Sequence, residues 1–356
     1  MKKTKTKKIL TVLSLGALLW SPSGWADPAI PIPTEIVDRS TDVNGLFINH
    51  DDMAYLAANQ SGLVIYDVSD PEKPVYQGRY KTSGYAEDVT VVSKSGDGTK
   101  TYAYVVESED GLEIIDVTDP ASTFLVGSYT FTSWDYYASE VAVNGNYAYV
   151  SAQAELLILD ISDPTLPTLE TSIDVEARGG MVIDGNYLYL AADSDGLVIV
   201  DISDPTTPEV LSATALASDA TDVKVDGDYA YLSIDEEGMT VVDISDLSAP
   251  EVVGFGSCGG PSSDSGEADA THLDVKDDFI YLSCENNGIS ILDISDPTDP
   301  ELTDYYDTSA NAQDIQVVDG YAFVADYRSF QVFDVSDATD IDYITKRKIA
   351  KFSIVP

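Results

Sequence analysis

Five ionisable residues hold equivalent places along the chain and would supply the chemistry of a cation site. Each stands directly before the first apolar residue of a short segment in which apolar and polar residues alternate: Asp88, Glu140, Asp222, His272 and Asp314. Gly45 and Gly180 hold the same place in two further segments. If these seven segments surround one axis, four carboxylates and an imidazole converge at one opening. Carboxylates suit Ca²⁺ or Mg²⁺, and an added imidazole suits a transition metal.

The same positions have a second explanation. The side chains would cap the loop that enters each segment and bind backbone N–H groups instead of a metal. Like charges at this distance would raise one another's pKa unless a cation or water separates them. Both explanations stay open. If a cofactor is bound, we expect Ca²⁺, held by Asp88, Glu140, Asp222 and Asp314.

Aromatic and basic residues gather in the segments that interrupt the regular pattern. They are Tyr85, Trp134, Tyr136, Tyr137, Arg178, Tyr327 and Arg328. Irregular loops on a rigid scaffold are where binding residues concentrate, and aromatic rings stack on sugars or on apolar patches of a partner. We therefore predict a binding surface for a protein or a carbohydrate. Packing between neighbouring units at the rim is the alternative for the aromatic residues.

Recognisable enzyme motifs are absent from the sequence. It contains no G-x-S-x-G elbow, no H-E-x-x-H pair, no phosphate-binding loop and no dinucleotide fingerprint. His50 and His272 are the only histidines, which excludes a site that needs three of them. We predict no catalytic residues.

Seven copies of one pattern would position all these residues. Each copy contains an apolar run that ends in an aspartate: Asp67, Asp116, Asp160, Asp201, Asp243, Asp293 and Asp334. The copies recur about every 44 residues, which is the period of a four-stranded propeller blade. Most runs continue as x-Ser-Asp-Pro. These carboxylates would also suit Ca²⁺, but a turn in which Asp and Ser bind nearby backbone N–H groups explains the repetition better.

The fourth copy shows the internal order of a repeat most clearly. Its pattern predicts strands over 180–184, 187–191, 197–202 and 208–213, with a tight Gly185-Asn186 turn after the first. One sheet with two apolar faces cannot bury both, whereas seven sheets stacked around an axis can. The sequence therefore predicts an all-β fold, a seven-bladed β-propeller of four-stranded antiparallel blades, present as a monomer.

Two segments are candidates for the outer strand of the last blade. Residues 31–40 resemble a detached outer strand that would latch the beginning of the chain to its end. The seventh copy also carries a fourth strand of its own, around 343–348. The mode of ring closure therefore stays open.

The run Leu197-Val-Ile-Val-Asp201, followed by Ile-Ser-Asp-Pro, resembles the LVIVD repeat family of exported bacterial and archaeal proteins. The resemblance covers residues 40–345. It implies a β-propeller that is associated with the cell surface, and it implies no chemistry because the family carries no agreed catalytic residues. Leu247 and Ala338 stand where the other copies have proline, which weakens two turns without challenging the fold.

Residues 1–26 have the three parts of a secretory signal peptide. A Lys-rich start precedes an apolar run from Ile9 to Trp20, and Gly24 and Ala26 supply small residues before a cleavage site. The run is too short to span a bilayer, and no cysteine follows it for lipid attachment. We predict a signal peptide at 1–26, a single propeller domain at 27–356, and a secreted, periplasmic or cell-surface location without membrane insertion after cleavage.

Two cysteines, Cys258 and Cys284, enclose most of a glycine-rich insertion at 254–266. An even cysteine count in an exported protein predicts one disulfide, and a free pair of thiols is the alternative.

Acidic residues outnumber basic ones by 62 to 19, for a net charge of −43. This excludes nucleic acid as a partner and disfavours docking on anionic membranes, because both depend on Lys and Arg. A content of 44% hydrophobic residues still allows a folded core.

Three functions are compatible with this sequence. The first is an exported, non-enzymatic binding or scaffold protein that presents a loop-rich face to a protein or glycan. The second is a cation-dependent hydrolase or lyase with its site at the channel mouth. The third is an acidic envelope or matrix component that gathers cations. The sequence favours the first.

Overall fold

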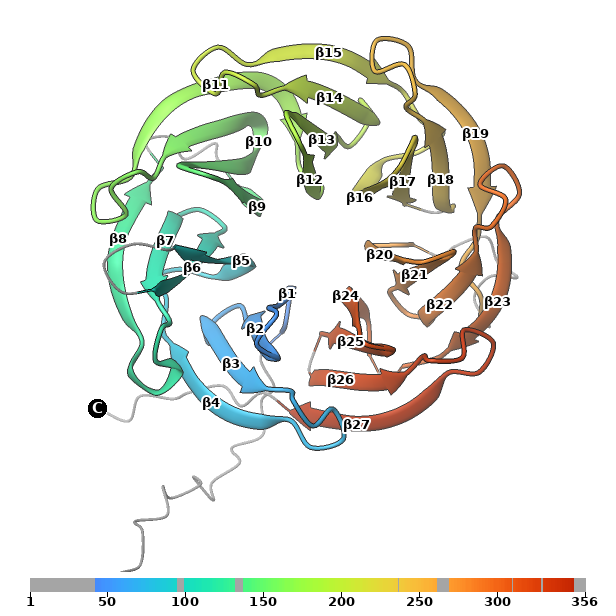
Figure 1. The fold of residues 1–356 in the computed structure, drawn as a ribbon, viewed down its shortest axis with the longest axis horizontal. Helices are drawn as coiled ribbons and strands as arrows, with labels where there is room; N and C mark the ends of the chain where they lie inside the picture. Colours follow the sequence, from blue (N-terminus) through green and yellow to red (C-terminus); the bar gives the residue numbers. More distant parts are fainter. Residues whose placement is uncertain are drawn as a thin grey trace, which may run out of the picture. The chain divides into compact units, whose positions relative to one another are not determined.

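Seven antiparallel sheets stand around a central axis like the blades of a propeller (Figure 1). The computed structural model describes residues 42–94, 99–131, 137–235, 237–260, 269–308, 310–327 and 329–348, all within the compact unit Val37–Pro356. The predicted signal peptide at 1–26 and the predicted latch at 31–40 lie outside the described residues. Within these ranges, no helix is long and apolar enough to cross a bilayer. The predicted seven-bladed all-β propeller is confirmed.

The strands of each blade follow one another from the axis to the rim. The innermost strands are β1 (Gly45–Ile48), β5 (Ala86–Lys94), β9 (Ala138–Asn144), β12 (Met181–Asp184), β16 (Ala220–Asp226), β20 (His272–Lys276) and β24 (Ala312–Val318). The second strands are β2 (Met53–Ala57), β6 (Lys100–Glu107), β13 (Tyr187–Ala191), β17 (Tyr229–Ile234), β21 (Phe279–Cys284) and β25 (Tyr321–Asp326).

The third and fourth strands complete the blades. The third strands are β3 (Leu63–Asp67), β7 (Gly111–Asp116), β14 (Leu197–Asp201), β18 (Gly238–Asp243), β22 (Gly288–Asp293) and β26 (Ser329–Asp334). The outer strands are β4 (Val75–Tyr80), β8 (Phe124–Thr130), β11 (Thr168–Ala177), β15 (Glu209–Thr214), β19 (Glu251–Gly256), β23 (Glu301–Tyr306) and β27 (Asp342–Lys348). A short 3₁₀ turn, η1 (Pro120–Ser122), precedes β8.

The third blade joins its second and third strands in one continuous span, β10 (Tyr147–Asp160). Its first part pairs with β9 and its second part with β11. The span folds back at Gln153, where φ is 59°. The residues that flank the span also meet, because Ile161 N–H donates to the Asn146 carbonyl at 2.8 Å. The connection is shorter than in the other blades, but the order of the strands is the same.

The hydrophobic core consists of seven layers, each shared by two neighbouring blades. Strand β14 shows why the predicted run is apolar throughout: Leu197 and Ile199 pack against the fifth blade, while Val198 and Val200 pack against the third. Successive side chains of a strand point to opposite faces, so a sheet covered on both sides needs an unbroken apolar run. The repeat sequence therefore follows directly from blade stacking.

The ring closes between the first and seventh blades by the same kind of packing. Leu46 and Ile48 of β1 pack against Phe323 and Phe330 of the seventh blade. Val43 N–H donates to the Tyr327 carbonyl at 3.1 Å. Strand β27 supplies the outer strand of the seventh blade from that repeat itself. Each described blade is thus built from one contiguous stretch of sequence.

The repeated aspartates act as turn acceptors. The aspartate that ends each third strand accepts a hydrogen bond from the backbone N–H two residues later, at 2.8–3.0 Å. In six repeats the second aspartate does the same at 3.0–3.1 Å. Hydrogen bonds from Ser203 lower the pKa of Asp201, since they favour the charged form. The turn explanation of this motif is confirmed.

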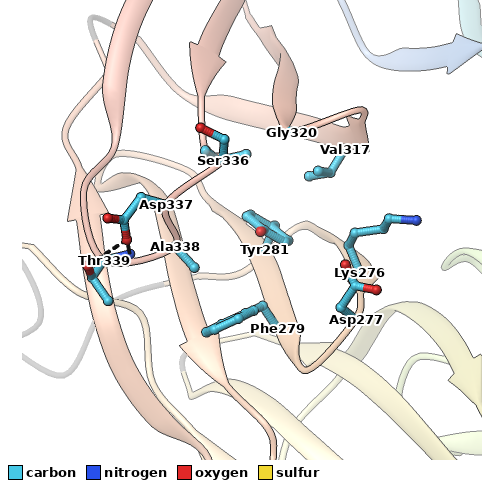
Figure 2. Close-up of a pocket in the computed structure, with 11 residues that line it drawn as sticks. Lys276, Asp277, Phe279, Tyr281, Val317, Gly320, Ser336, Asp337, Ala338 and Thr339 are labelled. Atoms are coloured by element: carbon cyan, nitrogen blue, oxygen red, sulfur yellow. Dashed lines mark hydrogen bonds between the residues drawn. The ribbon is translucent and has the colours of Figure 1, made fainter.

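A hollow of about 480 Å³ lies between the sixth and seventh blades, on the face opposite the start of the innermost strands. Figure 2 shows Phe279, Tyr281 and Ala338 around it. The hollow coincides with two small residues of the seventh repeat. Ala338 stands where Pro297 stands in the sixth, and Gly320 stands where Asp278 does, its carbonyl accepting the equivalent bond from Val335.

Restoring the missing proline should stabilise the fold. Thr339 N–H bonds Asp337 just as Thr298 N–H bonds Asp296, so the two turns have matching capping bonds. We expect Ala338→Pro to raise the free energy of unfolding by about 0.5–1 kcal/mol, through a less flexible unfolded chain. Chemical denaturation measures it. Pro297→Ala is the matched control and should cost a similar amount; a destabilising Ala338→Pro would contradict the equivalence of the turns.

Candidate functional site

The five predicted residues converge at the centre of the ring, on the face where all innermost strands begin. His272, at the start of β20, places its Nε2 3.0 Å from Oε1 of Glu140 on β9. These strands belong to the sixth and third blades, which face each other across the axis in Figure 1. The pair therefore spans the central channel. The structure confirms that repeat register brings these side chains together.

Three carboxylates bind the backbone of the next blade in the ring. Asp88 accepts from Val141 N–H at 3.0 Å, Asp222 accepts from Leu273 N–H at 3.2 Å, and Asp314 accepts from Leu46 N–H at 2.6 Å. Each bond joins one innermost strand to its neighbour, and the Asp314 bond joins the seventh blade to the first. These contacts resemble the predicted caps, except that they hold the adjacent blade rather than the residue's own loop.

The two glycines of the ring make room for these carboxylates. A Cβ on Gly45 would lie 2.7 Å from Oδ1 of Asp88, and one on Gly180 would lie 2.0 Å from Oδ1 of Asp222. Distances this short are not tolerated between nonbonded atoms. Glycine at these positions is therefore required by the close approach of the next blade.

The chain supplies its own cations to this ring. Lys224, two residues after Asp222 on β16, places its Nζ 2.8 Å from Oδ2 of that aspartate. Burial alone would lower the pKa of His272, but the charge of Asp314 and the hydrogen bond with Glu140 raise it to about 10. Burial also opposes the charge on Lys224, and the Asp222 carboxylate outweighs it and raises the lysine pKa. Both residues are therefore cationic at neutral pH.

Two of the carboxyls stay poorly solvated despite these cations. Burial and the charge of Glu140 raise the pKa of Asp88 well above its usual range, although the Val141 bond opposes this. Burial raises the pKa of Asp314 to about 6, with the His272 charge acting in the opposite direction. The protonated, neutral form of these two carboxyls is therefore favoured, which limits the negative charge at the axis.

No group of three or more His, Cys, Asp or Glu side chains is arranged to hold a metal ion in the part of the chain that the structure describes. The carboxylates point at backbone N–H groups and at His272 and Lys224 instead. Ca²⁺ binding by Asp88, Glu140, Asp222 and Asp314 stays a prediction, and the geometry supplies no preformed ligand set for it.

A cavity of about 450 Å³ opens above the ring, and we call it the funnel. Every blade contributes to its lining, through Asn44, Glu87, Glu140, Arg178, Asp219, His272 and Gln313 in chain order. Most of the residues that line it are polar or charged. Such a lining favours a polar ligand whose hydroxyl, amide or charged groups can replace the displaced water.

One wall of the funnel holds residues that the sequence did not single out as ligand-binding. Arg178 pairs with Asp193 at 3.4 Å. Burial and a hydrogen bond with Asp219 raise the pKa of Asp193, while the Arg178 charge opposes the rise. Asp193 and Asp219 lie in loops of different blades. Their only sequence signal is that both belong to loops of the same face as Arg178.

Tyr85, Tyr137 and Arg178 lie on the funnel side of the propeller, because the outer strands end and the innermost strands begin there. Tyr327 lies on the same side, between β25 and β26. Tyr85 is 50% exposed and Tyr137 is 47% exposed. The Tyr137 hydroxyl donates to Glu87 at 3.1 Å. Tyr327 is also exposed, and its φ of 31° lies in the left-handed region. Trp134, Tyr136 and Arg328 lie outside the described residues.

The predicted disulfide joins Cys258 to Cys284. It ties the beginning of the glycine-rich insertion, just after β19, to the end of β21. Gly259 N–H then donates to Ser290 Oγ at 2.9 Å. The insertion is therefore anchored on the same face as the funnel.

Comparisons with known proteins agree with this architecture. The family described as the LVIVD repeat matches residues 50–82, 83–131, 136–175, 179–213, 217–255, 267–308 and 309–342. No curated protein matches the chain.

Several solved structures share the fold at low sequence identity. Sqt1 of Saccharomyces cerevisiae has a TM-score of 0.63 at 8% identity, with 86% of each chain covered. The computationally designed Ika8 protein has a TM-score of 0.55 at 10% identity, covering 82% of this chain and 95% of that one. BamB from Moraxella catarrhalis has a TM-score of 0.53 at 14% identity, covering 80% and 81%.

The charge on His272 should make stability depend on pH. The pKa of His272 is higher in the folded protein than in the unfolded chain. The free energy that its charge contributes to folding is therefore complete below about pH 6.5 and is lost as the pH rises through about 10. We expect His272→Gln to lower the free energy of unfolding at pH 7 by about 3–5 kcal/mol, since Glu140 then lacks its partner. The variant should lose less stability than the wild type between about pH 7 and 10.

Chemical unfolding across this pH range measures both effects. His50→Gln, on an exposed turn of the first blade, is the control and should behave like the wild type. If the free energy of unfolding depends on pH in the same way for the wild type and for His272→Gln, His272 is not the cation that stabilises the ring.

Proposed function

Since the chain belongs to the LVIVD repeat family, we propose that it is an exported binding and scaffold protein whose ligand site is the funnel. The observation that carries the proposal is the lining of the funnel by polar side chains from all seven blades. A ligand seated on the axis contacts the whole ring at once, and blade packing fixes the position of each contact. The partner is a protein or a carbohydrate.

The arrangement of the carboxylates supports binding over catalysis. A hydrolase or lyase at the channel mouth needs a carboxylate that is free to accept a proton or to hold a cation. Asp88, Asp222 and Asp314 instead bond the backbone of neighbouring blades, and Glu140 bonds His272. Asp88, Asp222 and Asp314 thus hold the ring together, while the funnel lining, which includes Glu140 and His272, is left to recognise a ligand.

Export is supported by two features. Residues 1–26 have the pattern of a signal peptide, and a disulfide such as Cys258–Cys284 persists in oxidising compartments. We therefore place the mature protein in the periplasm, at the cell surface or outside the cell.

Arg178 offers the sharpest test of this function. It is the basic residue of the funnel wall with an exposed side chain, 52% accessible. If it contacts the ligand, Arg178→Ala removes a charged hydrogen bond and should weaken binding about 10–100-fold. Binding of the mature protein to an array of neutral and acidic oligosaccharides, and to extracts of envelope proteins, identifies the ligand for this measurement.

Lys276→Ala is the matched control, because this exposed lysine lies at the hollow on the opposite face. Its substitution should leave binding unchanged. An affinity that drops with Lys276→Ala and not with Arg178→Ala would place the ligand on the other face and contradict the proposal. Turnover of a bound oligosaccharide would favour the hydrolase instead.

A further inference from the structure

Two carboxyl groups lie side by side inside the second blade, away from the axis. Glu107 ends β6 and is 1% exposed, and Glu113 lies on β7 and is 6% exposed. Neither forms an ion pair within the described ranges of the chain. Among the residues that the structure describes, none donates a hydrogen bond to Glu107 Oε1 or Glu113 Oε2, and both oxygens are buried. Buried oxygens of this kind carry a large cost unless something satisfies them.

One hydroxyl, Ser83 Oγ, lies within hydrogen-bond distance of an oxygen of each carboxyl. A hydroxyl has one proton and two carboxylates have only acceptor oxygens, so a proton on one of the carboxyls would supply the donor that the group lacks. Burial and the charge of Glu113 raise the pKa of Glu107 to about 7, which keeps this proton in place near neutral pH.

The same pair fastens the loop between β4 and β5, residues 81–85. Ser83 Oγ lies 2.9 Å from Oε2 of Glu107 and 3.0 Å from Oε1 of Glu113. Gly84 N–H donates to Oε2 of Glu107. These contacts bind Ser83 and Gly84 to the pair, while Ser108 N–H donates to the carbonyl of Tyr85, the last residue of the loop, at 3.1 Å.

The loop approaches the pair closely at Gly84. A Cβ on Gly84 would lie 2.7 Å from Oε2 of Glu107 and 2.1 Å from Oδ2 of Asp110. The loop therefore sits against acidic groups with no space between. Any gain of negative charge on the pair acts directly on these contacts.

The surroundings contribute further negative charge. Asp110 faces the loop from the turn between β6 and β7, and Tyr80 ends β4, where both glutamates raise its pKa in addition to burial. Lys81 is the basic group of the loop, and its Nζ bonds the Thr82 carbonyl. Glu87, on β5, bonds Ser108 and Tyr137.

We propose that Glu107 and Glu113 share one proton, and that loss of this proton to solvent releases the loop at 81–85. With both groups ionised, the donor that this proton supplies is lost and two buried like charges repel. The loop then opens to let water reach them. Because Glu87 follows this loop and lines the funnel, loss of the shared proton makes one wall of the funnel sensitive to pH.

Hydrogen exchange of the backbone amides tests the proposal on the intact mature protein. A group whose pKa is near 7 when the loop is closed and near 4.5 when it is open makes opening about tenfold more favourable at about pH 8.5 than at about pH 6. We expect protection of residues 81–85 to fall by that factor, after correction for intrinsic exchange. The turn at 203–207 in the fourth blade lacks a buried carboxyl pair, and its amides bond Asp201 and Asp204, so it serves as the internal control.

Glu107→Gln is the matched variant, because its amide keeps a neutral donor at the same place. Its loop protection should not change between the two pH values. Protection of the wild-type loop that stays constant relative to the control turn would overturn the proposal, whether or not the variant folds. Wild-type protection restored at about pH 8.5 by millimolar Ca²⁺, and removed by a chelator, would overturn it also, since the pair then binds a cation instead of a proton.

Discussion

The requirement to neutralise buried acids at the axis governs this propeller. Seven innermost strands begin around one channel, and their starting positions carry Asp88, Glu140, Asp222 and Asp314. Unpaired charges cannot be buried at acceptable cost. The chain meets this requirement with His272, which reaches across the channel to Glu140, and with Lys224, which contacts Asp222. Backbone N–H groups of adjacent blades take the remaining lone pairs, so the same carboxylates hold neighbouring blades together.

The fold and the convergence of these residues could be predicted because both depend on a repeat. The apolar run occurs in seven copies, and this repetition predicts the stacking of seven blades. Residues at equivalent positions of the copies then lie around one ring. The even cysteine count, in a chain expected to be exported, likewise predicted the bond between Cys258 and Cys284. Lys224 and the need for glycine at 45 and 180 could not be predicted. They depend on distances between different blades, and no pattern within one repeat reports such distances.

The sequence could not decide between a metal site and a structural ring for the same reason, because the answer depends on distances between blades. The sequence contains four acids and one histidine at equivalent positions, which suits either. Only the three-dimensional structure shows that Asp222 points at Leu273 N–H and at Lys224. The repeated Asp turns differ, because both partners lie within two residues of each other and the local motif is sufficient. Asp193 and Asp219 were missed for the opposite reason: their contact joins two blades.

The most direct test of this account is the titration of the His272 imidazole by NMR. The chain has only two histidines, so the His272→Gln variant assigns the signals without ambiguity. If the imidazole is the cation of the ring, it stays protonated at about pH 8 and titrates near pH 10, with or without a chelator. Titration near the ordinary pH of about 6.5 would contradict the account, because the ring would then need a cation from outside the chain.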